Sequence, residues 1–141
     1  MVDEAQRLVG AWRLVSVETR DEGGELVRRG ERTGYLIYSP GGYMSVSFMK
    51  EGRPEFESGD IRGGTVDEKI AAINGYVSYA GRYTVRGDTV VHHIEVSLFP
   101  NWVGESQERT YRLKDDRLTL STPLMLVGGR RLSTHLVWER A

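Results

Sequence analysis

The chain has 141 residues, a length typical of one domain with a single core, so we expect one domain over residues 1–141. Its 19 Lys and Arg residues nearly balance 20 Asp and Glu residues, which leaves no basic stripe for nucleic acid. Cysteine is absent, the N-terminus lacks a secretory signal and no apolar run could cross a bilayer, so we expect a cytoplasmic protein without disulfides or membrane contacts.

Short segments rich in Val, Tyr, Thr and Leu alternate with turn signals along the chain. Glycine doublets and polar turns such as Lys114-Asp115-Asp116 separate these segments, which is the pattern of consecutive β-strands. We expect eight strands, at residues 11–19, 33–38, 43–49, 79–86, 89–97, 106–113, 117–121 and 131–139. Eight strands in a meander favour a closed barrel, which removes the sheet edges.

Two helices are predicted beside the strands. A short one runs from Asp3 towards Gly10, and the capping box Thr65-Val66-Asp67-Glu68 starts another over residues 67–73. The four long connections, residues 20–32, 50–78, 98–105 and 122–130, fall on alternate turns of the meander and therefore share one rim. We predict an all-β, eight-stranded up-and-down antiparallel barrel whose mouth is covered by a lid helix in the third connection.

Two pairs of sequence stretches resemble known families. Gly10-Ala11-Trp12 and Trp138-Glu139-Arg140 resemble the lipocalin, or calycin, signature, and this resemblance implies that Arg140 lies across Trp12 at the closed end. Residues 34–45 and 92–102 are similar to bacterial and fungal stand-alone lipocalin-like domains. The resemblance covers nearly the whole chain and implies a barrel with a cavity, but no catalytic residues.

Side chains alternate between the two faces of a strand, so each hairpin turn predicts which residues share the inside of the barrel. A two-residue loop at Gly87-Asp88 places His92 inside and His93 outside, and a four-residue loop at residues 39–42 places Tyr35 inside. Arg109 also points inwards, where either Glu18 or a ligand could be its partner. The predicted ligand-binding residues are Tyr35, Tyr79, Tyr83, His92, Trp102, Arg109 and Tyr111.

Three functions fit this pattern. The first is binding or carrying a small hydrophobic or mixed-polarity molecule, and the second is a cofactor-free isomerase or cyclase acting on a carbonyl-bearing, polyketide-like substrate with His92 as general base. The third is a filled barrel that acts through its surface in a homodimer. No nucleotide-binding fingerprint is present, and adjacent His92 and His93 point to opposite faces, so we expect neither cofactor nor metal.

Overall fold

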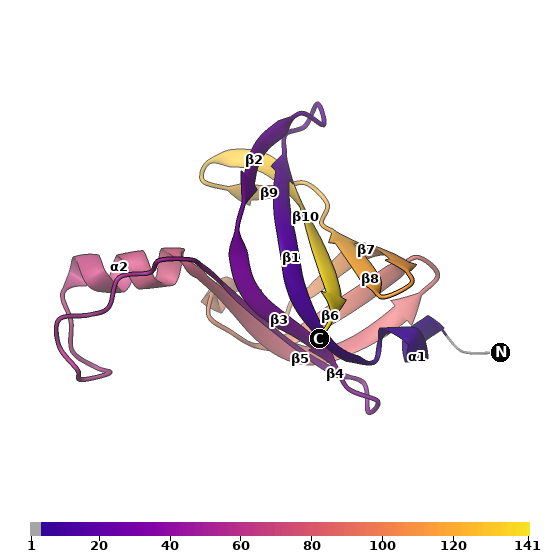
Figure 1. The fold of residues 1–141 in the computed structure, drawn as a ribbon, viewed down its shortest axis with the longest axis horizontal. Helices are drawn as coiled ribbons and strands as arrows, with labels where there is room; N and C mark the ends of the chain where they lie inside the picture. Colours follow the sequence, from indigo (N-terminus) through magenta and orange to yellow (C-terminus); the bar gives the residue numbers. More distant parts are fainter. Residues whose placement is uncertain (1–3) are drawn as a thin grey trace.

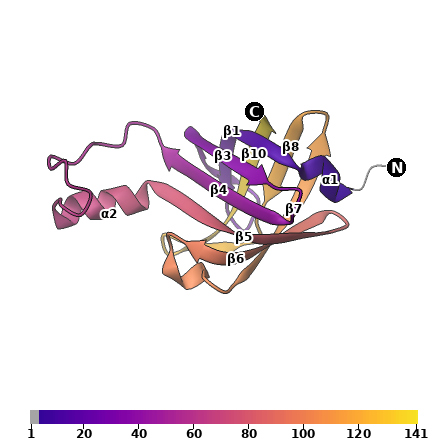
Figure 2. The same cartoon turned by 90° about the horizontal axis from the view of Figure 1, so that it is seen from below.

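The computed structural model describes residues 4–141 and contains an eight-stranded antiparallel barrel (Figures 1 and 2). Consecutive barrel strands are neighbours, and the first and last pair to close the sheet, as the sequence predicts. The barrel strands are β1 (Gly10–Arg20), β3 (Arg32–Tyr38), β4 (Tyr43–Lys50), β5 (Tyr76–Arg86), β6 (Thr89–Ser97), β7 (Ser106–Lys114), β8 (Arg117–Ser121) and β10 (Arg130–Arg140).

Two further strands that the sequence analysis missed lie in the long connections. β2 (Leu26–Gly30) pairs with the end of β1, and β9 (Met125–Val127) pairs with the start of β10. The turn before β2 is closed by Asp21, whose carboxylate accepts bonds from the backbone N–H groups of Gly23 and Glu25. Both strands extend the wall at the open end of the barrel (Figure 1).

The closed end carries the predicted contact between Trp12 and Arg140. The guanidinium of Arg140 lies 4.3 Å from the Trp12 ring centroid and donates to the backbone oxygens of Arg7 and Val9. The Trp12 indole donates to the backbone oxygen of Leu8 at 2.9 Å. These bonds dock α1 (Glu4–Leu8) under the barrel. Asp3, where we expect this helix to start, lies outside the described residues.

The prediction for the β3 strand faces is wrong. Tyr38 pairs with Met44, and the backbone N–H of Ser39 donates to Tyr43, so the hairpin loop has three residues rather than four. This change of one residue reverses every side chain of β3. Tyr35 is therefore half-exposed on the outer surface, and Tyr38 is buried inside.

Two bulges reverse the faces of β1 and β6 partway along. The register of β1 against β10 shifts between Leu14 and Ser16, so Val17 points inwards and Glu18 points outwards. In β6, Val96 pairs with Ala80 and Ile94 pairs with Gly81, so Glu95 is an extra residue. Val96 is therefore exposed, although strict alternation from the inward His92 predicts that it points inwards. Gly81 is required there, because a Cβ would lie 1.9 Å from the His93 carbonyl oxygen.

The third connection is an arm that stands away from the barrel, and we call residues 51–75 the arm. It contains α2 (Val66–Asn74), which starts with the predicted capping box at Thr65 and Glu68. No residue of α2 is buried, and the helix projects beside the mouth instead of covering it (Figures 1 and 2). The predicted helix is therefore present, but it does not close its own barrel here. Within residues 4–141, no helix has the length and apolarity to span a membrane.

Candidate ligand cavity

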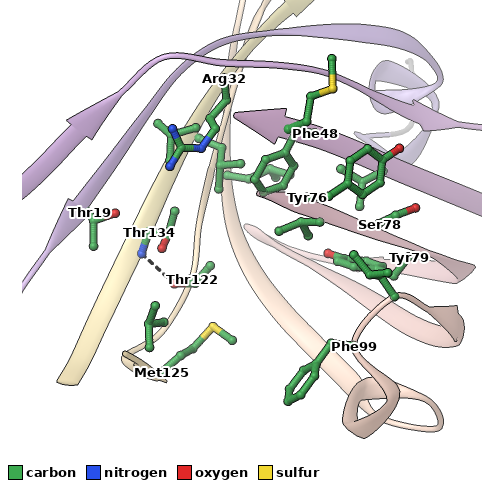
Figure 3. Close-up of a pocket in the computed structure, with 18 of the residues that line it drawn as sticks. Thr19, Arg32, Phe48, Tyr76, Ser78, Tyr79, Phe99, Thr122, Met125 and Thr134 are labelled. Atoms are coloured by element: carbon green, nitrogen blue, oxygen red, sulfur yellow. Dashed lines mark hydrogen bonds between the residues drawn. The ribbon is translucent and has the colours of Figure 1, made fainter. Parts of the chain in front are cut away.

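A cavity of about 690 Å³ opens between the long connections (Figure 3). Its wall is mainly apolar, with Leu36, Val46 and Leu136 on the inner faces of the strands and Phe99 and Trp102 in the β6–β7 connection. The charged side chains that line it are all basic: Arg28, Arg32, Lys50 and Arg109. Within residues 4–141, no Asp or Glu side chain contributes to the wall. The cavity therefore suits an apolar body that carries an electron-rich or anionic group.

His92 lies deep in this cavity between two tyrosines. Its Nε2 is 2.7 Å from the Tyr38 hydroxyl, and its Nδ1 is 2.7 Å from the Tyr79 hydroxyl. A neutral imidazole has one donor and one acceptor nitrogen, so one tyrosine donates to the ring and the other accepts from it. Both ring nitrogens are thus engaged, which holds the imidazole in one orientation.

Burial keeps these three side chains uncharged. Burial, with smaller contributions from the nearby Arg109 and His93, lowers the pKa of His92 to about 3. Burial also raises the pKa of Tyr38 well above its ordinary value, and it raises the pKa of Tyr79 despite the opposing effect of Arg109. Near neutral pH, Arg109 is therefore the charged member of this group.

Arg109 is a buried cation whose protein partners are all neutral. Its guanidinium donates to the amide oxygen of Gln107 and, at 3.0 Å, to the backbone oxygen of Glu108, and it also interacts with the Tyr79 hydroxyl. No ion pair joins it to a carboxylate of residues 4–141.

Glu18, the partner considered from the sequence, is turned to the surface by the β1 bulge. There its carboxylate binds Arg20 at 2.7 Å and Arg29 at 2.6 Å. These two bonds, that to Arg29 first, lower the pKa of Glu18.

The structure brings four of the seven predicted site residues to the cavity: Tyr79, His92, Trp102 and Arg109. The hydroxyl groups of Tyr83 and Tyr111 instead donate to the backbone oxygens of Ser39 and Gly87, in hairpins at the closed end. Tyr35 points away from the cavity, for the reason given above.

Tyr38 was missed by the sequence analysis. A three-residue interpretation of the Pro40-Gly41-Gly42 turn would have found it. The structure also brings Phe48, Tyr76 and Phe99 to the cavity wall (Figure 3). Within residues 4–141, no three His, Asp or Glu side chains form a group that could hold a metal ion.

Comparison with known proteins agrees with the barrel architecture. The chain is 37% identical over 107 residues to the 4'-hydroxy-3'-methoxypropiophenone carrier protein ppsC of Aspergillus oryzae, and the match covers 69% of this chain and 96% of that protein. A lipocalin-like protein from Bacteroides uniformis has the same fold, with a TM-score of 0.50 and 13% identity over 95% of this chain and 98% of that one. Residues 9–141 match the Lipocalin-like domain family, and the chain belongs to that family.

Proposed function

We propose that this protein binds and carries a small, mainly apolar molecule that presents a hydrogen-bond acceptor or an anionic group to Arg109. The cavity volume of about 690 Å³ lies within the range of ordinary ligand pockets, about 300–1,000 Å³. The apolar wall would hold the body of the ligand, and Tyr79, Trp102 and Arg109 would contact it. The fungal relative is named as the carrier of an aryl ketone that bears a hydroxyl group, a molecule of this chemical class.

The observation that carries the proposal is the charge of Arg109, which has no carboxylate partner within residues 4–141. A buried cation without a counter-charge costs several kcal/mol, and a protein retains such a group at a cavity when a ligand completes it. A ligand phenolate, carboxylate or carbonyl oxygen would supply the missing partner. Arg28, Arg32 and Lys50 at the mouth would attract an anionic ligand over a longer distance.

The state of His92 favours binding over the alternative enzymatic function. A general base works best when its pKa lies near the working pH, and the pKa of His92 is about 3. Both of its nitrogens also bond tyrosine hydroxyls rather than facing the cavity unoccupied. In this proposal His92 has a structural role, as a rigid part of the cavity floor. The cytoplasmic location expected from the sequence remains a prediction.

Calorimetric titration with 4'-hydroxy-3'-methoxypropiophenone tests the proposal, with displacement of the anionic dye anilinonaphthalene sulfonate as a second readout. We expect Arg109→Met to weaken binding by roughly 10- to 100-fold, since it removes a charged hydrogen-bond donor worth about 1.5–3 kcal/mol. Arg112→Met is the matched control, because Arg112 lies on the same strand with its side chain exposed outside the barrel. Equal binding by both variants, or no binding of either probe to the native protein, would refute the proposal.

A further inference from the structure

The arm is an ordered unit that packs mainly on itself. Arg53 donates to the backbone oxygen of Ala72 at 3.2 Å, and the Glu68 carboxylate accepts from the backbone N–H groups of Glu57 and Thr65. At its base, the backbone N–H of Lys50 donates to Gly75 at 2.9 Å. These bonds lay the extended first half of the arm along α2 and hold both halves in line with β4 and β5.

One face of the arm is apolar, and no part of residues 4–141 buries it. Val66, Ile70 and Ile73 recur at intervals of four and three residues, so they form one stripe along α2. Val66 is 73% exposed and Ile70 is 51% exposed, and Ile61 at the tip of the arm is 96% exposed. A helix with such a stripe normally buries it, because an isolated helix of this length is marginal in water.

The rim of the barrel is a second exposed apolar surface. Leu126 in β9 is 77% exposed, and Val127 and Phe99 beside the mouth are also exposed. These rim residues line the cavity, whereas Ile73 is the one member of the α2 stripe that does so.

The charges of the two surfaces are complementary. Residues 51–75 contain six acidic and three basic side chains, whereas the charged residues lining the mouth, Arg28, Arg32 and Lys50, are all basic. A contact between arm and rim would therefore bury apolar area and bring opposite charges together.

We propose that the arm of one copy closes the cavity mouth of a second copy, so that two copies exchange arms in a symmetric dimer. The arm leaves its own barrel in the direction of β4 and β5 and does not bend back over its own mouth (Figures 1 and 2). Folding back would break the bonds at its base, whereas reaching a second barrel needs no rearrangement.

The size and symmetry of such a contact are ordinary. Two-fold symmetry makes both contacts identical, and an arm of this length is comparable to the roughly 20–30 residues that each partner gives to a standard interface. The dimer does not depend on the proposed ligand, but it would close each cavity with residues of the other copy.

Sedimentation velocity provides the first test. The native chain should sediment as a dimer, at twice the 15.9 kDa mass of one chain, and Ile70→Asp should shift it to the monomer. The matched control is Ala71→Asp, which places the same charge at an exposed position of α2 outside the apolar stripe. A native monomer at every concentration, or a dimer that survives Ile70→Asp, would overturn the proposal. Since α2 contributes nothing to the barrel core, circular dichroism should show all variants folded.

Crosslinking identifies what the arm contacts. The chain has no cysteine, so Ile70→Cys and Leu126→Cys each introduce a single thiol. When the two single variants are co-expressed, a short bis-maleimide should join one copy of each into a covalent dimer. Three outcomes would overturn the proposal. The first is efficient self-crosslinking of Ile70→Cys alone, and the second is no crosslink in any sample. The third, in a variant that carries both Ile70→Cys and Leu126→Cys, is a crosslink found only within one chain.

Discussion

Acid should destabilise this barrel because of His92, and it should do so at a pH well above that at which the carboxylates of the protein titrate. The pKa of His92 is about 3 in the folded protein, whereas an exposed histidine in the unfolded chain has a pKa of about 6.5. Below pH 6.5 the imidazole of residue 92 becomes protonated in the unfolded chain but stays neutral in the folded protein. The free energy of unfolding therefore falls as the pH falls. The limiting slope for one such group is about 1.4 kcal/mol per pH unit, and the loss continues down to about pH 3.

Between pH 7 and pH 4.5 this single residue should lower the free energy of unfolding by about 2.5 kcal/mol, an order-of-magnitude figure. Urea unfolding of the native protein and of His92→Gln at several pH values measures it. The variant is less stable at pH 7, because it loses bonds to Tyr38 and Tyr79, but its stability should depend less on pH. Parallel pH profiles for the two proteins would refute the reasoning, since groups other than His92 contribute equally to both.

Three further substitutions test the packing, each by urea unfolding. Trp12→Ala should lower the free energy of unfolding by about 3–5 kcal/mol, because it empties the closed end and leaves Arg140 without its ring; a loss below about 1 kcal/mol would contradict this. Leu36→Ala should lower the free energy of unfolding by about 2–5 kcal/mol, and the neighbouring Tyr35→Ala should lower it much less. The reverse order would favour the four-residue hairpin loop, with Tyr35 inside. Arg109→Met should stabilise the empty protein by about 1 kcal/mol or more while weakening binding, since it removes a buried unpaired charge. A loss of both stability and binding would instead indicate a structural role for Arg109.

Local signals in the chain were sufficient for the eight barrel strands and the two helices, but not for β2 and β9. The turn residues at Gly87-Asp88 and Lys114-Asp115-Asp116 place two of the strand pairs, β5–β6 and β7–β8, and the Thr65 capping box marks the start of α2. Trp12 and Arg140 come together because an even number of strands returns the chain to the end where it started. These features depend on residues close in sequence or on a strand count, and both can be read without a structure.

The faces of the strands depended on single-residue shifts that only the closed barrel decides. One residue fewer in the β3–β4 loop brings Tyr38 rather than Tyr35 to His92, and one bulge turns Glu18 away from Arg109. A bulge forms where a strand must twist to close the sheet, so its position reflects pairing with distant strands rather than local sequence. The sequence by itself therefore determined the barrel and its inward His92 and Arg109, whereas tertiary structure decided that Arg109 has no carboxylate partner among the described residues and that the arm stands away from its own mouth.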